Sequence, residues 1–108
     1  MPGRVSTRRQ FAEFSTPTGR GQSGSLRVVF VEHPGQGSCA IAFAISKKVG
    51  NAVVRNRIRR QLRAAIDGLS PAPHPGLYLI KCAKGTGQLS YDEIQQHLRA
   101  ALGRAHAL

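Results

Sequence analysis

Residues 46–63, SKKVGNAVVRNRIRRQLR, are the part of this chain that decides its fold. The stretch begins as a basic loop, is interrupted at Gly50-Asn51, and continues with apolar and basic side chains at helical spacing. Asn51 is a suitable N-cap and Gly68 a suitable stop. We therefore expect a helix with one apolar stripe and a wide basic face. The stripe consists of Val54, Ile58, Leu62, Ala65, Ile66 and Leu69.

Three other segments have the composition of β-strands. Residues 26–32 and 77–83 are rich in Val, Leu and Ile, and residues 39–46 alternate strictly. The alternation places Ile41, Phe43 and Ile45 on one face. The other face is flat, because it carries Ala40, Ala42 and Ala44. Residues 33–37 favour a turn, so we expect the first two of these strands to pair as a hairpin.

The remaining segments complete an α+β domain. Residues 6–14 favour a short first helix, and residues 15–25, STPTGRGQSGS, favour a loop. Ser90 and Glu93 have the spacing of a capping box and open a last helix, whose inward side chains are Ile94, Leu98, Ala101 and Leu102. Residues 1–5 are expected to form a flexible arm. The order helix, strand, strand, helix, strand, helix predicts one domain over residues 1–108, a two-layer sandwich with helices packed on one sheet.

The charge of the chain indicates a polyanionic partner. The 108 residues carry a formal charge of +11, and the sequence pI is about 11.4, which is typical of nucleic-acid-binding domains. No acidic residue lies between Glu32 and Asp67, so the basic stretch is uncompensated along the chain. An apolar content of 41% is too high for a disordered basic tail, which indicates that the charge covers a folded body.

The sequence predicts neither a catalytic centre nor a metal site in the protein itself. Nucleases built from protein need clustered carboxylates or paired histidines. The five acids are spread along the chain at Glu13, Glu32, Asp67, Asp92 and Glu93, and the four histidines are scattered at His33, His74, His97 and His106. Cys39 and Cys82 lie in apolar strand-like segments, so we expect reduced, buried thiols. With no long apolar run and no secretory signal, the predicted location is the cytoplasm.

The basic stretch resembles the signature of the bacterial ribonuclease P protein subunit. The core of that signature is Arg55-Asn56-Arg57, preceded by Ser-Lys-Lys-x-Gly-Asn-Ala at residues 46–52. The resemblance extends over nearly the whole chain, from Phe11 through LYLIKCAK to the helix start LSYDE. It implies a fold of the ribosomal protein S5 domain 2-like kind with a left-handed βαβ crossover, against the usual handedness of such units.

The resemblance also implies a function. Members of the family bind a catalytic RNA, and the resulting ribonucleoprotein is an endonuclease, a hydrolase that removes the 5′ leader of precursor tRNA. The RNA performs the cleavage with Mg²⁺, which it mainly binds itself. The implied partners of this chain are therefore the catalytic RNA and precursor tRNA, with no membrane and no protein partner.

Site residues follow from the same resemblance. Those expected to contact the RNA subunit, or to shape the loop that does, are Ser46, Lys47, Lys48, Gly50, Asn51, Ala52, Arg55, Asn56, Arg57, Arg59, Arg60 and Arg63. Phe11 and Phe30 match aromatic residues of the family's leader cleft, and Phe14 is a further candidate for the same stacking platform. Taken singly, each of the three is also compatible with an ordinary core position.

The chain departs from the family pattern at three positions. Ser15 stands where a second aromatic residue is usual, and Ala40 and Ala83 stand where arginine is common.

Two other interpretations of the function stay open on the sequence alone. A ribosomal-type RNA-binding module shares the charge and the fold, and a DNA-compacting protein shares the charge.

Overall fold

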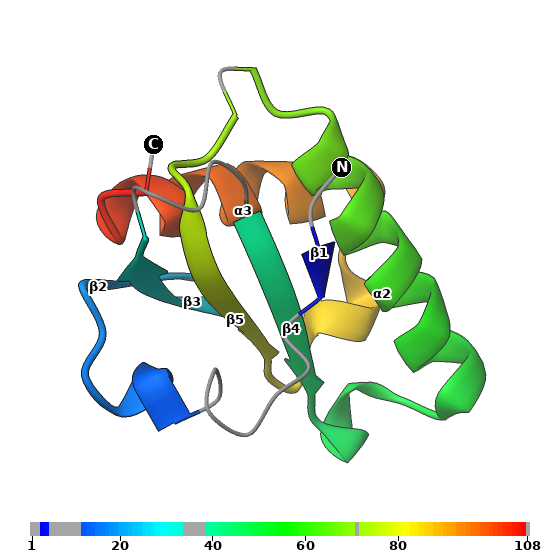
Figure 1. The fold of residues 1–108 in the computed structure, drawn as a ribbon. Helices are drawn as coiled ribbons and strands as arrows, with labels where there is room; N and C mark the ends of the chain where they lie inside the picture. The colour runs from blue at the N-terminus through cyan, green and yellow to red at the C-terminus, as the bar shows by residue number, and fades with distance from the viewer. Residues whose placement is uncertain (1–2, 5–11, 34–38, 71, 108) are drawn as a thin grey trace.

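The computed structural model describes residues 3–4, 12–33, 39–70 and 72–107. Within them the chain forms five strands, two helices and three short 3₁₀ turns (Figure 1). The strands are β1 (Gly3–Arg4), β2 (Gly19–Ser23), β3 (Leu26–Glu32), β4 (Cys39–Ile45) and β5 (Gly76–Cys82). The helices are α2 (Ala52–Asp67) and α3 (Tyr91–Arg104), and the turns are η1 (Glu13–Ser15), η3 (Lys47–Val49) and η4 (Thr86–Gln88).

All five strands belong to one sheet, in the order β1-β4-β5-β3-β2. β5 lies between β3 and β4, antiparallel to β3 and parallel to β4. The predicted hairpin of residues 26–32 with residues 39–46 is therefore wrong, because these two strands are not neighbours. Alternation along a strand assigns its faces but does not select the strand that pairs with it.

The unit β4–α2–β5 gives the fold its handedness. It joins two adjacent parallel strands through a helix that lies behind the sheet in the view of Figure 1, and its crossover is left-handed. Most such connections are right-handed. The α+β sandwich and the unusual crossover implied by the resemblance are thus both present.

β2 lies in the segment for which the sequence predicted a loop, and this prediction is wrong for residues 19–23. β2 pairs with β3 over its whole length and packs against α3. A Cβ at Gly19 would lie 2.1 Å from the carbonyl oxygen of Ala105, and one at Gly21 would lie 2.0 Å from that of Ala101. These glycines therefore let the helix approach the strand closely, a role that loop chemistry in the sequence concealed.

Helix α2 begins and ends as predicted, and α3 begins as predicted. The Asn51 side chain accepts a hydrogen bond from the backbone N–H of Val54, and Gly68 is the C-cap of α2. Ser90 and Glu93 form a complete capping box at the start of α3. The inward residues of both helices are confirmed. Those buried are Ile58, Leu62, Ala65 and Ile66 in α2 and Ile94, Leu98, Ala101 and Leu102 in α3. Val54 and Leu69, at the two ends of the predicted α2 stripe, are partly buried against the same core.

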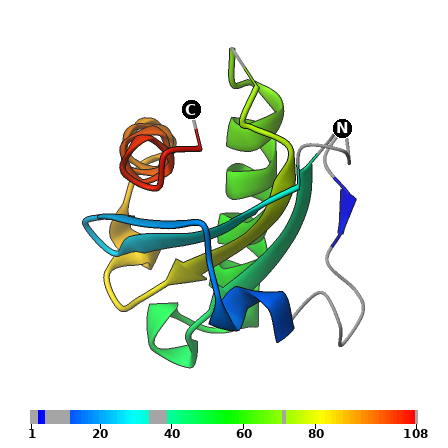
Figure 2. The ribbon, with the colours of Figure 1, turned by 60° about the vertical axis from the view of Figure 1, so that its left-hand side comes forward.

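The sheet has two different faces. Helices α2 and α3 cover one face, and the turn that contains η1 lies over the other (Figure 2). The main core is on the helix side, where Phe30 and Tyr78 stack with ring centroids 4.8 Å apart. The second face carries a smaller apolar cluster, formed by Val31, Ala40, Ala42 and Leu77, with Phe14 and Leu79 packed against it.

Both cysteines are free and buried, as predicted. Burial raises the pKa of the Cys82 thiol to about 12, and it also raises the pKa of Cys39. Neither thiol is therefore poised to act as a nucleophile near neutral pH.

The structure describes only part of the N-terminal segment for which a flexible arm and a first helix were predicted. Residues 3 and 4 form β1, which pairs in parallel with β4, so the flexible arm predicted for residues 1–5 is wrong at these two positions. The rest of that arm, and residues 6–11 of the predicted first helix, lie outside the described residues. None of the helices in the described part of the chain is long and apolar enough to cross a membrane. The cytoplasmic location stays a prediction.

Candidate nucleic-acid interface

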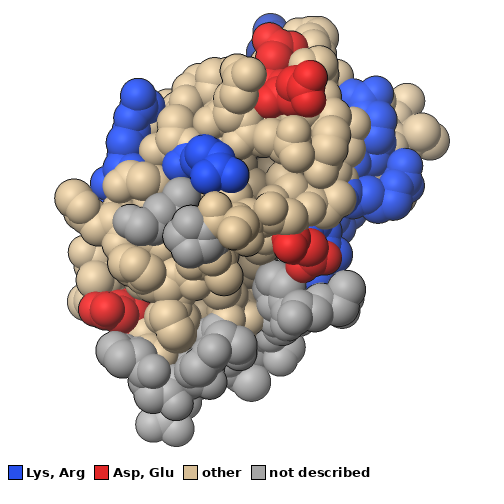
Figure 3. Space-filling view, turned by 90° about the horizontal axis from the view of Figure 1, so that it is seen from above, with Lys and Arg blue, Asp and Glu red and all other residues tan. Residues whose placement is uncertain are grey.

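The cations of α2 lie on more than one side of the helix. Seen from above, Lys and Arg side chains gather on the side of the molecule where α2 lies (Figure 3). Arg63 lies over the ring of Phe43 in β4, 5.4 Å from its centroid, and Arg59, one turn earlier, shares that flank. Arg60 is exposed. Helical spacing places Arg57 on the flank that faces η4.

Arg57 has a structural contact that the sequence did not indicate. Its Nη2 donates a hydrogen bond to the carbonyl oxygen of Gly87 at 2.7 Å, and its side chain is partly buried. It therefore ties α2 to the loop after β5. Arg57 is therefore only partly available on the basic face of α2, whereas Arg60 is exposed there.

Arg55 is held differently from the other cations. It is partly exposed, but its Nε is buried and has no hydrogen-bond partner among the described residues. Helical spacing places it one turn before Arg59, on the same flank. Asn56 accepts a hydrogen bond from Arg59 Nη1 at 2.8 Å, which restrains the Arg59 guanidinium. The Arg55-Asn56-Arg57 triplet is therefore divided between two flanks of α2.

The loop before α2 is ordered by its own polar side chains. Ser46 caps η3 by accepting a hydrogen bond from the backbone of Lys48 at 3.2 Å, and Asn51 caps α2. The side chains of Lys47 and Lys48 are exposed. The two polar residues thus act on the backbone, and the two lysines are the ones that face solvent.

The face of the sheet opposite the helices carries a basic groove. One hollow of about 290 Å³ is lined by Phe14, Arg20, Arg27, Val29, Leu79 and Lys81. A second, of about 700 Å³, lies toward η3 and the loop after β5, and its cations are Arg27, Lys48, Lys81 and Lys84. Arg27 and Lys81 line both hollows, so the two adjoin at this pair, and we call them together the basic groove. No acidic residue is among the described residues that line it.

Arg27 and Lys81 are direct partners across the antiparallel pair β3–β5. Like charges in that position repel and so destabilise the isolated domain, although Arg27 Nη2 also donates a hydrogen bond to Gln22 Oε1 at 3.3 Å. A bound polyanion would offset the repulsion. This pair was not among the predicted site residues, although strand alternation indicates its face: Lys81 alternates in phase with Leu77 and Leu79, which lie on the face away from the helices.

The three aromatic candidates for leader binding have different outcomes. Phe30 is 1% exposed and lies in the core beneath the helices, so its assignment to an exposed stacking platform is wrong. Phe14 is partly exposed and lines the groove, where its role stays a prediction. Phe11 lies outside the described residues. Of the positions that depart from the family pattern, Ala83 lines the larger hollow and Ala40 is buried on the same face.

The acids and histidines form contacts that are better explained by structure than by catalysis. His33 Nε2 lies 2.9 Å from Glu13 Oε1, and Ser23 Oγ lies 2.8 Å from His97 Nδ1. The described residues contain no group of three His, Cys, Asp or Glu side chains placed to hold a metal ion. The prediction that the protein has no catalytic or metal site of its own stays a prediction.

Comparisons with known proteins agree with the resemblance. A family model described as Ribonuclease P matches residues 2–106. The ribonuclease P protein component of Clavibacter michiganensis is 36% identical over 87 residues, covering 80% of this chain and 77% of the relative. That of Ligilactobacillus salivarius is 33% identical over 101 residues, covering 90% of this chain and 89% of the relative.

Solved structures show the same fold. The RNase P protein of Staphylococcus aureus superposes with a TM-score of 0.82 at 19% identity, covering 99% of this chain and 98% of that one. The RNase P protein of Thermotoga maritima gives a TM-score of 0.75 at 18% identity, covering 89% and 91%. Because the family model spans nearly the whole chain and relatives exceed 30% identity, this chain belongs to the ribonuclease P protein component family.

Proposed function

We propose that this chain is the protein subunit of a ribonuclease P that binds the catalytic RNA through α2 and its preceding loop, and the 5′ leader of precursor tRNA through the basic groove. Family membership implies a ribonuclease P subunit, a partnership with the ribonuclease P RNA and a role in tRNA processing. The assignment of Arg27 and Lys81 to the leader-binding groove is our addition.

The observation that carries the proposal is the groove with Arg27 and Lys81 at its centre. Two cations held side by side, with an aromatic side chain at one end, match a single strand, whose phosphates need positive charge and whose bases stack on any flat ring. Such a groove holds a strand without reading its sequence. That property suits a leader, because leaders differ from one precursor to another.

The surface on α2 suits a structured RNA. The residues proposed to contact the catalytic RNA, or to shape the loop that does, are Ser46, Lys47, Lys48, Asn51, Arg55, Asn56, Arg57, Arg59, Arg60 and Arg63. Guanidinium groups grip phosphates with two parallel hydrogen bonds. The Arg63–Phe43 contact and the Arg59–Asn56 bond restrain two of these groups, so less side-chain entropy is lost on binding.

The protein's part in cleavage is binding and orientation. Since the described residues bring no three potential metal ligands together, we assign no step to a protein-bound metal. Mg²⁺ would be held mainly by the RNA subunit, where phosphate oxygens supply the hard ligands it prefers. The groove holds the leader, and the cations of α2 lower the repulsion between protein-bound leader and catalytic RNA.

Cleavage of precursor tRNA by the cognate RNA, with and without this protein across a Mg²⁺ titration, tests the proposal. We expect the protein to shift activity to lower Mg²⁺, and the complex to bind precursor tRNA more tightly than mature tRNA. Coincident curves with saturating protein would refute the function. Equal affinity for both tRNAs would leave a general RNA-binding module, and equal competition by double-stranded DNA would favour a DNA-compacting protein.

A further inference from the structure

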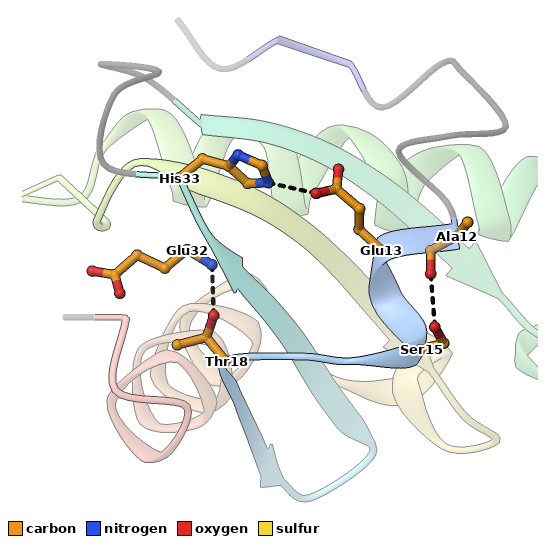
Figure 4. Close-up of polar contacts among 6 residues, drawn as sticks. All are labelled: Ala12, Glu13, Ser15, Thr18, Glu32 and His33. Carbon is orange, nitrogen blue, oxygen red and sulfur yellow. Dashed lines mark hydrogen bonds and ion pairs between the residues drawn. The ribbon is translucent and has the colours of Figure 1, made fainter.

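The segment of residues 13–18, which comprises η1 and the turn that leads into β2, crosses the open face of the sheet and is attached to it near both ends (Figure 4). At its far end the backbone N–H of Thr18 donates to the carbonyl oxygen of Phe30 at 2.7 Å, and the Thr18 hydroxyl accepts from the N–H of Glu32 at 2.8 Å. At its near end Glu13 Oε1 meets His33 Nε2 at 2.9 Å. The segment is thus attached twice to the end of β3.

His33 is a fixed point for this attachment. Its backbone N–H donates to the carbonyl oxygen of Pro75 at 3.1 Å, in the segment that enters β5. The imidazole therefore projects from a junction of two central strands rather than from a free loop. Each side chain of the ion pair is 37% exposed, so water only partly competes with the contact.

Glu13 is the residue directly before Phe14, the aromatic side chain at the end of the groove. Phe14 packs against the apolar cluster of the open face, and its backbone position is set by the turn that Glu13 fastens. We propose that the Glu13–His33 ion pair is a positioning contact for leader binding: it holds Phe14 at the groove before RNA arrives. This inference rests on the proposed function and names two residues that act through a third.

The negative charge of Glu13 allows a positioning role to be distinguished from simple electrostatic repulsion of RNA. A carboxylate beside a groove for a polyanion weakens RNA binding by simple repulsion, so its removal should improve binding if charge alone mattered. If the ion pair pre-organises Phe14, removing the pair should weaken binding instead. The turn would then have to become ordered on binding, and this ordering makes the binding free energy less favourable. The two explanations predict opposite signs.

The kinetic test uses the holoenzyme reconstituted from the catalytic RNA and the full chain. For Glu13→Gln we expect KM for leader-bearing precursor to rise about two- to five-fold, the range for a partly exposed ion pair, with kcat unchanged. Glu32→Gln is the matched control, since it removes the same charge nearby and its side chain points away from the pair (Figure 4). Its KM should stay equal or fall. The double variant Glu13→Gln with His33→Gln should be no worse than either single one.

A second readout does not depend on RNA. The chain contains no tryptophan, so Phe14→Trp introduces a unique fluorophore at the groove. Adding Glu13→Gln should shift the emission of this introduced indole toward that of an exposed one, whereas adding Glu32→Gln should not. An unchanged emission, or a KM that falls equally in both Gln variants, would overturn the proposal. If the wild-type complex shows no preference for a leader, the proposed function fails. The fluorescence measurement still decides whether the Glu13–His33 pair holds residue 14 at the groove.

Discussion

Replacing Lys81 by Gln tests the groove through two properties that should change in opposite directions. Lys81 faces Arg27 across the β3–β5 ladder, where Cα atoms of opposite residues are about 4.5–5.5 Å apart. With the charged groups splayed to about 7 Å in water, their repulsion is about 0.6 kcal/mol before screening. A Debye length of about 30 Å at 0.01 M salt leaves most of it, and one of about 3 Å at 1 M leaves almost none.

The variant should therefore be more stable than the natural chain at low salt. A gain of about 0.5 kcal/mol corresponds to a rise in Tm of about 2–4 °C for a domain of this size. The gain should vanish at high salt. Arg20→Gln is the matched control for stability, because Arg20 lines the same groove but faces the apolar Val29. It should raise Tm less than Lys81→Gln does.

Binding of the leader should weaken in both variants. Each phosphate contact removed from a single strand lowers the slope of log affinity against log salt by about 0.7, so the affinity lost between 50 and 200 mM salt shrinks by about 2.6-fold. Thermal melts followed by circular dichroism, and filter binding of precursor against mature tRNA in the presence of the catalytic RNA, measure the two quantities. An unchanged Tm at low salt would refute the cross-strand repulsion, and an unchanged preference for the leader would refute the groove.

Three further predictions concern α2, α3 and β2. Arg60→Ala should weaken binding of the RNA subunit and leave Tm unchanged, whereas Arg57→Ala should also lower Tm, since it removes the hydrogen bond to the η4 loop; parallel melts and filter binding distinguish them. Gly21→Ala should destabilise the domain by about 1–3 kcal/mol in urea unfolding, because α3 must retreat from the new Cβ. The pKa of Glu93 is lowered, first by the hydrogen bond from the Ser90 backbone and then by the Ser90 side chain, so its contribution to stability is present above the ordinary pKa of 4.5 and lost as pH falls through the lowered value. The protection factors of the amides in the first turn of α3, which correct for the intrinsic pH dependence of exchange, should fall over that acidic range. Protection factors that stay constant there would contradict the capping role.

Local interactions explain why much of the fold was predictable. The bounds of α2 depend on the Asn51 cap, on Gly68, and on the spacing of its apolar residues, all of which lie within one segment. The capping box of α3 is equally local. The basic stretch and its resemblance to the ribonuclease P signature likewise need no tertiary contact, which is why the family could be predicted before any geometry was known.

Errors arose where a residue's environment depends on segments far away in the chain. The sequence does not assign Phe30 to a face, because 26–32 is almost continuously apolar, yet Phe30 shares the parity of Leu26, and both point into the core under the helices. Gly19 and Gly21 are typical of turns and so predict a loop, although here they make room for α3 beside β2. In each case the deciding neighbour is contributed by another element.

The sequence by itself determined the identity of the family, the extent of α2, the start of α3, the strand character of three segments and a net positive charge that indicates a polyanionic partner. Only the tertiary structure decided that β5 separates β3 from β4, and thereby that Arg27 and Lys81 meet on the open face with Phe14 at the end of their groove. The physical reason is that helical periodicity and capping are satisfied within a few residues. Strand partners and shared surfaces are selected by the packing free energy of the whole domain.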